Sequence, residues 1–265
     1  MKHICNCVAL GIICSKFVLP HAAMGQTPSE PATITAGAGR PLANVLDQLQ
    51  HLFLQPICYE EAPFESPADV KSAAVASSIA PNVALRVTLG ATDVNPYFAS
   101  STALSAYRNA GLPGVYNAVQ NNGWVAVVPS QVSGTDGNLR SVVPVMSSKA
   151  TFPAVSCRGV DTLQLVVDAM SQASGSKVLL LNQPFWPNDM VTVSASGEQA
   201  GDVIQKIGSI IGRPVSYQCL YDASSQAYYL NVIIVSPPPV PGSTVRPRPL
   251  PLPLLGPPNS PWFAK

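Results

Sequence analysis

Two stretches of the chain carry the same pattern of hydrophobic and polar positions. In residues 40–64 the apolar residues fall at the spacing of one helix face, at Leu42, Val45, Leu46, Leu49, Leu52 and Phe53. Residues 161–185 repeat the pattern without a gap, so that Leu42 aligns with Leu163 and Phe64 with Phe185. The spacing predicts an amphipathic helix in each stretch.

Residues at the ends of the two stretches predict where these helices begin and end. Pro41 fits the first turn of a helix. Asp161, with Gln164 three residues later, has the pattern of a capping box at the start of the second helix. Gly175 is expected to end that helix. Short strand patterns precede the helices ("ATITA", "TFPAVSC") and follow them ("PICYE", "KVLLLN").

The similarity loses register after Phe64 and returns at an offset of 101 residues instead of 121, where Gly111 aligns with Gly212 and Tyr116 with Tyr217. The first copy therefore carries 20 extra residues, which we place in an Ala- and Ser-rich surface excursion. A second amphipathic helix is predicted before each of these glycines. A hairpin is predicted after each, and the first turns at Asn122-Gly123.

The repeated order predicts an α+β fold of two tandem βαββαββ lobes. We expect the first lobe at residues 31–129, a polar linker at 130–149 that contains "SQVSGTDGNLR", and the second lobe at 150–236. Residues 237–265 hold 11 of the 27 prolines. Proline at this density favours an extended chain, so we expect a disordered or extended tail.

The first 25 residues have the features of an export signal. Lys2 precedes an apolar stretch, and the small residues Ala23 and Gly25 predict cleavage between Gly25 and Gln26. An uncleaved membrane anchor is the alternative, but Lys16 interrupts an apolar run that is already shorter than the roughly 20 residues of a membrane span. Cys14 follows Ile13, whereas a lipoprotein signal needs a small residue there. We expect a periplasmic or secreted protein with no transmembrane span in the mature chain.

Charge and composition argue against several classes of function. Removal of residues 1–25 takes the net charge from +1 to −1, because Lys2 and Lys16 are lost. A chain with this balance and no basic cluster is not expected to bind nucleic acid. His51 is the only histidine after residue 25. We therefore expect no metal site, no cofactor and no catalytic residues, a nucleophile–base pair of Cys58 and His51 included.

Two groups of residues leave alternatives open. Cys58, Cys157 and Cys219 remain after cleavage, and they allow three disulfide pairings or none. Glu60, Glu61 and Glu65 form the only acidic cluster, and neighbouring residues of a strand point to opposite faces. We interpret this cluster as a solvated strand end, or else as part of a polar partner-binding rim. The rim would consist of Tyr59, Glu60, Glu61 and Phe64.

The order of elements resembles the short N-terminal domain (STN) shared by secretins and TonB-dependent receptors. The segment "VTVSASGEQAGDVIQKIGSIIGRPVSY" carries the resemblance, which spans the second lobe fully and the first lobe at both ends. It implies a periplasmic domain that binds other proteins and has no catalytic residues. We expect two such lobes without a receptor barrel or a secretin pore.

These observations predict an exported, non-catalytic envelope protein that acts through protein–protein interaction. The resemblance suggests a secretion, TonB-type uptake or surface-signalling assembly. The expected partners are envelope proteins, with self-association as an option. An exported hydrolase with an unrecognised site is an alternative, and so is a cell-wall or adhesion protein.

Overall fold

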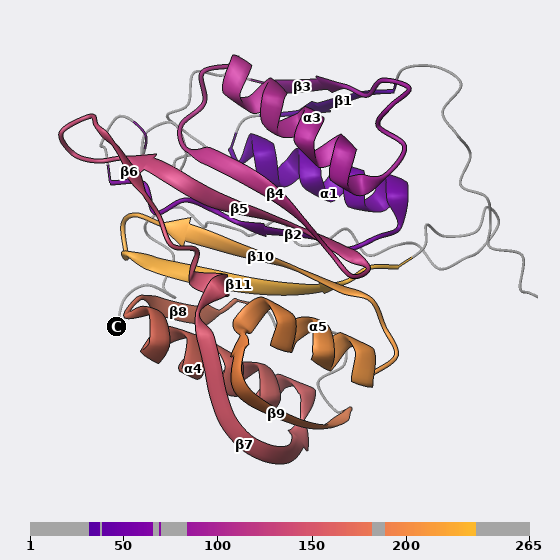
Figure 1. Ribbon diagram of the computed structural model, residues 1–265, viewed down its shortest axis with the longest axis vertical. Coiled ribbons are helices and arrows are strands. Elements are labelled where there is room, and N and C mark those ends of the chain that lie inside the picture. Colours follow the sequence, from indigo (N-terminus) through magenta and orange to yellow (C-terminus); the bar gives the residue numbers. More distant parts are fainter. Residues whose placement is uncertain (1–31, 38, 66–68, 70–83, 182–188, 237–265) are drawn as a thin grey trace, which may run out of the picture.

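The computed structural model describes residues 32–37, 39–65, 69, 84–181 and 189–236. The expected signal peptide with Gly25 and Gln26, nearly all of the excursion, Phe185 and the proline-rich tail lie outside these residues. The described part is a mixed α+β fold with four α-helices, so the α+β class is confirmed (Figure 1).

The described residues between 33 and 133 form two longer helices and five strands. In chain order these elements are β1 (Thr33–Ala36), α1 (Pro41–Phe53), β2 (Ile57–Glu60), β3 (Leu85–Thr88), α3 (Pro96–Asn109), β4 (Val115–Asn121) and β5 (Trp124–Ser133). The remaining described residues begin with a short strand and a 3-10 turn, β6 (Leu139–Ser141) and η1 (Val145–Ser147). They continue with β7 (Lys149–Arg158), α4 (Gly159–Ser174), β8 (Lys177–Leu180), β9 (Met190–Gln199), α5 (Ala200–Ile210), β10 (Val215–Asp222) and β11 (Ala227–Ile234).

One central sheet joins both halves of the described chain in the order β4-β5-β2-β10-β11-β8, with β6 beside the end of β5. Within it β2 pairs in parallel with both β5 and β10. Two further sheets consist of β1 with β3 and of β7 with β9. The pairing order is therefore the same in both halves: β4-β5-β2 with β1-β3, and β10-β11-β8 with β7-β9.

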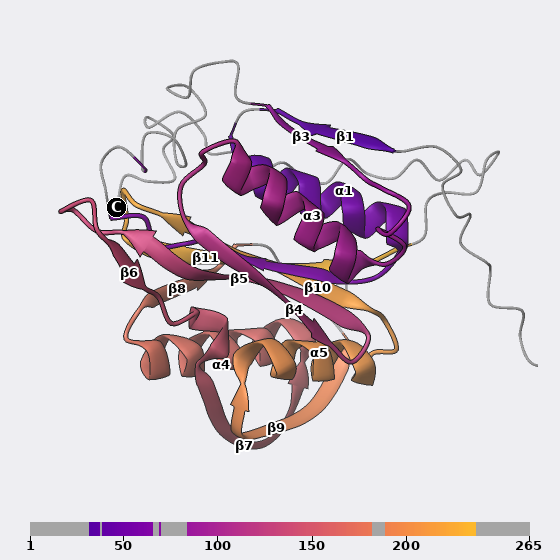
Figure 2. The same cartoon turned by 45° about the horizontal axis from the view of Figure 1, so that its top comes forward.

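The helices lie on opposite faces of the central sheet. Helices α1 and α3 cover one face and carry the β1–β3 pair on their outer side, while α4 and α5 cover the other face and carry β7–β9 (Figures 1 and 2). Two hydrophobic clusters fill the space between the helices and the two faces. Strand β2 lies in the middle of the sheet, so all four of its residues are buried.

Side chains of β2 alternate between the two clusters, as strand geometry requires. Ile57 and Tyr59 belong to the cluster under α1 and α3, whereas Cys58 belongs to the cluster under α4 and α5. Leu220 of β10 also joins the first cluster. The two halves of the chain therefore share their cores across the β2–β10 junction.

Most of the predicted helix ends are confirmed. Pro41 begins α1, and Gly175 ends α4 with a φ of 70° in the left-handed region. The predicted capping box is wrong: α4 begins at Gly159, Asp161 lies in its first turn and pairs with Arg158 at 2.8 Å, and Gln164 bonds to Asp168. The carboxylate still lies at the positive end of the helix dipole, which favours it there.

Residues 130–149, where a polar linker was expected, contain secondary structure of their own. Strand β5 extends to Ser133, the chain turns, and β6 pairs back onto β5. The turn is closed by the Asp136 side chain, which accepts bonds from the Asn138 backbone N–H at 3.1 Å and from Arg140 at 3.2 Å. Glycine and short polar residues favour tight turns as well as linkers, so composition alone could not separate the two.

Candidate functional site

The most unusual polar groups of the described chain are two buried carboxylates at the β2–β10 junction. Glu60 is 0% exposed and Glu61 is 3% exposed. They point to opposite faces of the sheet, as the strand period predicted. Buried carboxylates need hydrogen-bond donors, because an unpaired charge in the interior is very unfavourable.

Glu60 points toward the α4–α5 side and holds the 3-10 turn η1 in place. Its Oε1 accepts a hydrogen bond from the backbone N–H of Val145 at 2.7 Å, and its Oε2 accepts one from Met146 at 2.8 Å. Burial raises the pKa of Glu60 to about 7, although these two backbone donors act in the opposite direction. The turn η1 contacts both α4 and α5, so Glu60 connects β2 to the helix layer of the other half.

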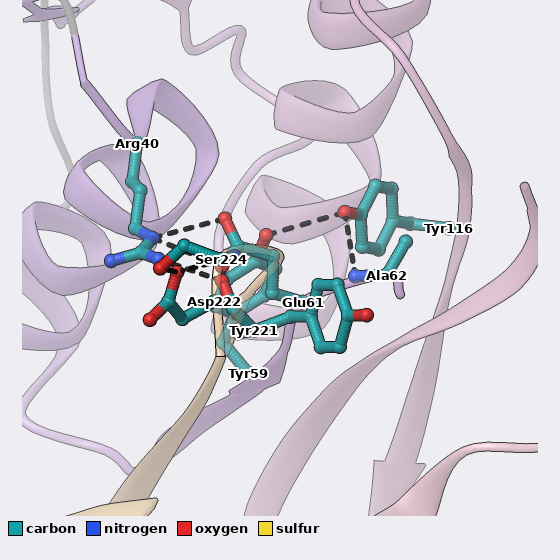
Figure 3. Close-up of polar contacts among 8 residues, drawn as sticks. All are labelled: Arg40, Tyr59, Glu61, Ala62, Tyr116, Tyr221, Asp222 and Ser224. Carbon is teal, nitrogen blue, oxygen red and sulfur yellow. Dashed lines mark hydrogen bonds and ion pairs between the residues drawn. The ribbon is translucent and has the colours of Figure 1, made fainter. Parts of the chain in front are cut away.

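Glu61 points to the other side and forms an ion pair with Arg40, which directly precedes α1. Nε of Arg40 donates to both carboxylate oxygens, at 3.1 and 3.0 Å, and Nη2 donates to the backbone carbonyl of Tyr221 at 2.9 Å (Figure 3). The Tyr221 backbone N–H donates back to Oε2 of Glu61 at 2.9 Å. Burial raises the pKa of the Glu61 carboxyl, and the Arg40 charge opposes this rise.

Tyrosine side chains enclose this ion pair. The Tyr116 hydroxyl accepts hydrogen bonds from the Ala62 backbone N–H at 3.2 Å and from the Tyr59 hydroxyl at 3.4 Å (Figure 3). The Tyr107 ring packs edge-on against Tyr116, with ring centroids 5.6 Å apart. On the β10 side, the Ser224 hydroxyl donates to Asp222 at 2.7 Å.

This arrangement joins the two halves and is not built like an acid–base pair. Each carboxylate already accepts bonds at both oxygens, and the two acids face opposite sides of the sheet. The cavity beside Arg40 measures about 20 Å³, which leaves room for about one water molecule. What the junction can do is fix the orientation of α1, β10 and η1 relative to one another.

The expectation of a solvated strand end at Glu60 and Glu61 is therefore wrong. Tyr59, Glu60, Glu61 and Phe64 are all buried, so they form no exposed rim in this structure. The physical reason is that β10 and η1 supply backbone donors from 85 or more residues away along the chain. Only Glu65 of the acidic cluster lies near solvent, within 3.7 Å of Arg140.

The remaining candidates for chemistry are separated from one another. His51 lies exposed on α1, with Nδ1 2.8 Å from the Asp47 carbonyl oxygen. Cys58 is buried; Gln205 donates to its sulfur at 3.3 Å, and burial raises the pKa of its thiol. All three described cysteines, Cys58, Cys157 and Cys219, are free thiols.

The surface offers a second candidate site at the end of the β4–β5 hairpin. A hollow of about 280 Å³ lies on one side of the turn and includes Trp124, Gln205 and Arg213. A second hollow of about 230 Å³ lies on the other side and includes Trp124, Asn95 and Tyr97. Both include Gly123, so the two hollows flank the turn. We call them together the hairpin-end groove.

Exposed apolar side chains flank the chain segments that line the second hollow. They are Leu52 and Leu54, next to the lining residue Gln55, and Val94 and Phe98, on either side of the lining segment Asn95–Tyr97. Leu52 was expected on the buried face of its helix, but it is exposed in the last turn of α1. The Phe98 ring packs edge-on against Tyr97 at 5.5 Å. Aromatic and aliphatic groups around a concave surface are typical of protein-binding sites.

Sequence reasoning missed the hairpin-end groove because its parts come from four separate segments: the residues after α1, the start of α3, the β4–β5 turn, and the end of α5 with the start of β10. Within the described residues, no cluster of three or more histidine, cysteine, aspartate or glutamate side chains could hold a metal ion. No helix in the described ranges combines the length and the apolar character needed to cross a bilayer.

Comparison with protein-family models, with curated proteins and with solved structures found no match.

Proposed function

We propose that this chain is an exported, non-catalytic envelope protein that acts through protein–protein interaction, with the hairpin-end groove as its binding site. We propose further that it consists of two tandem STN-like lobes. A secretion, TonB-type uptake or surface-signalling assembly is the setting that the resemblance suggests. The observation that carries the proposal is the groove itself: two hollows that share Trp124, with exposed Leu54, Val94 and Phe98 directly adjacent in sequence to residues that line the second hollow.

Matching hydrogen bonds in the two halves support the tandem arrangement. The Gln50 side chain accepts a bond from the backbone N–H of Ile57 at 3.1 Å. Ser171 and Val178, each 121 residues further on, make the same contact at 3.2 Å. An amphipathic pattern does not require a polar side chain at this point, so the shared bond favours common descent of the two halves.

The ends of the second helices match in the same way. After α3, the backbone N–H of Leu112 donates to the carbonyl of Tyr107 at 3.3 Å. After α5, Arg213 donates to Gly208 at 3.0 Å, and both residues lie 101 residues further on. The glycine directly before each donor residue, Gly111 or Gly212, has a left-handed φ of 66° or 67°. The offsets of 121 and 101 residues are those of the sequence repeat.

The groove suits an extended polypeptide segment that bears an apolar side chain. The exposed apolar groups around it provide a surface for such an anchor. Polar side chains line both hollows, among them Asn122 in the first and Gln55 and Gln120 in the second, and they can bond a peptide backbone. Anchors in hollows of this kind contribute most of the binding free energy in many interfaces.

Selection of peptides from a random displayed library on the immobilised protein tests the groove. We expect enriched peptides with an aromatic or aliphatic anchor, and binding weakened about tenfold or more by Phe98→Glu, since the substitution places a charge at the apolar border. Val143→Glu is the matched control, because Val143 is an 82% exposed apolar residue outside the groove. Equal binding by wild type and Phe98→Glu would refute the assignment.

Export is tested separately, by mass spectrometry of the protein expressed in a Gram-negative host. We expect mature protein in the periplasm or medium with Gln26 at its N-terminus. Ala23→Arg should block the cleavage, because signal peptidase requires small residues at this position. Full-length protein that stays in the cytoplasm would disprove export and would leave the groove unaffected.

A further inference from the structure

The junction between the two halves is a contact between unlike edges. Strand β2, which follows the first helix of its half, pairs in parallel with β10, the first strand of the hairpin of the other half. Such a contact is heterologous, since it joins two different surfaces. Heterologous contacts that do not close into a ring can continue from one unit to the next.

The same two kinds of edge stand at the two ends of the central sheet. Strand β8 follows α4 as β2 follows α1, and β4 opens its hairpin as β10 opens the other. The sheet begins with β4 and ends with β8. Among the described residues, no strand pairs with the outer edge of either one.

Strand directions allow the internal contact to be repeated between molecules. β4 is antiparallel to β5, β5 and β10 are both parallel to β2, β11 is antiparallel to β10, and β8 is parallel to β11. It follows that β4 and β8 run in the same direction. A second copy moved along the sheet without reversal would therefore place its β4 parallel to β8, which is the relation of β10 to β2.

The helices do not obstruct this arrangement. Within the chain, α1 and α3 lie on one face and α4 and α5 on the other, so the helices of adjacent halves do not share a face (Figure 2). The next copy would place its α1 and α3 beside α4 and α5 of the first copy, again on the opposite face. Each contact between copies would thus reproduce the layering of the internal junction.

The side chains along the two outer edges suit pairing. Three exposed apolar residues lie along these edges: Val119 on β4, Leu179 on β8, and Leu181, which directly follows the end of β8. Strand β4 contains no charged residue, and β8 contains only Lys177, at its first position. Edges that are kept apart usually carry charged side chains or prolines, and within their described length these two edges carry only Lys177, at the first position of β8.

We propose that copies of this protein associate head to tail through β8 of one molecule and β4 of the next, extending the central sheet. The internal register places Glu60 beside Cys219, and the equivalent pair between copies is Leu181 beside Ala118. The contact between copies lacks the bonds of Glu60 to η1, because Leu181 occupies the equivalent position. It is therefore weaker than the internal junction and reversible. The proposal does not depend on the hairpin-end groove.

Sedimentation velocity on two edge variants tests the proposal. Leu181→Lys blocks the β8 edge and Val119→Lys blocks the β4 edge, because a lysine at an exposed edge disfavours strand pairing. Val143→Lys changes an exposed residue on neither edge and is the control. At concentrations on the order of 10 to 100 µM, the range for weak contacts of small area, we expect wild type and the control to form chains longer than dimers.

The mixing experiment distinguishes head-to-tail contact from other association. Each blocked variant alone should remain monomeric, since it lacks one of the two edges. An equimolar mixture of the two should form dimers and nothing larger, because each variant supplies the edge that the other has lost. A monomeric wild type would overturn the proposal, and so would self-association of either variant alone. Leu179→Lys and Gln120→Lys replace the two variants if either fails to give the native near-ultraviolet circular dichroism spectrum.

Discussion

The buried carboxylate of Glu60 should make the stability of this protein depend on pH in a defined window. Burial raises its pKa from 4.5 to about 7 in the folded state. Between these values the folded chain keeps a proton that the unfolded chain has released. The contribution of Glu60 to stability is therefore fully present below about pH 4.5 and is lost as the pH rises toward 7.

The magnitude follows from the shift of the pKa. One pKa unit corresponds to about 1.4 kcal/mol, so a shift from 4.5 to about 7 corresponds to about 3 kcal/mol of stability lost across the window. The side chain is 0% exposed, so solvent screening does not reduce this value. Glu61 contributes in the same direction, because burial raises its pKa as well.

Glu60→Gln isolates the contribution of this one group. The amide keeps one carbonyl acceptor for the backbone N–H groups of Val145 and Met146 but does not titrate. Chemical denaturation between pH 4.5 and 8, followed by tryptophan fluorescence, gives the free energy of unfolding at each pH. We expect the difference between wild type and Glu60→Gln to change by about 3 kcal/mol across the window.

A destabilising control shows whether the pH dependence belongs to Glu60. Leu163→Val removes one methylene group from a fully buried side chain and adds no titrating group. It should lower stability by about 1 kcal/mol at every pH, so that its profile stays parallel to that of wild type. If the Glu60→Gln profile is also parallel to wild type, the reasoning about this carboxylate is refuted.

Two further substitutions test the junction and the packing of the helices. Arg40→Met leaves the buried Glu61 carboxylate without its cation and should cost about 3 kcal/mol at pH 8, and less as the pH is lowered, because protonation removes the unpaired charge; an equal loss at every pH would contradict this. Gly208→Ala places a Cβ 2.6 Å from a valine methyl group of β10 and should cost about 1–3 kcal/mol in urea unfolding, whereas Gly90→Ala, whose nearest atoms lie at 3.8 Å, should have little effect. Equal stabilities of the two alanine variants would show that β10 can move away.

Local signals in the sequence were sufficient for the helices and for the first hairpin. The apolar spacing from Leu42 to Leu49 and from Leu163 to Met170 corresponds to buried helix faces. Proline at the start of α1 and glycine after α4 acted through their own backbone preferences. Gly123 has a φ of 85°, which the tight turn between β4 and β5 requires. Each of these features depends on neighbours within a few residues.

The junction could not be predicted in the same way, because its contacts are long-range. Arg40 and the Tyr221 carbonyl are 181 residues apart along the chain. The donors to Glu60 and Glu61 include backbone N–H groups of other segments, which leave no residue-specific signal in the sequence. An acidic pair at the end of a strand is usually solvated, so local reasoning favoured the wrong environment.

The position of β2 in the sheet also limits the order in which the two halves of the protein can fold. Synthesis delivers β2 long before β10, so until β10 is made the edge of β2 that pairs with it has no neighbour, and Glu61 lacks its bond from the Tyr221 backbone N–H. Contacts with so large a separation along the chain form late and slow the final folding step. The first half cannot reach its final form until the last strands arrive, and a chain that ends before β10 would leave one edge of β2 unpaired and Glu61 without its bond from Tyr221.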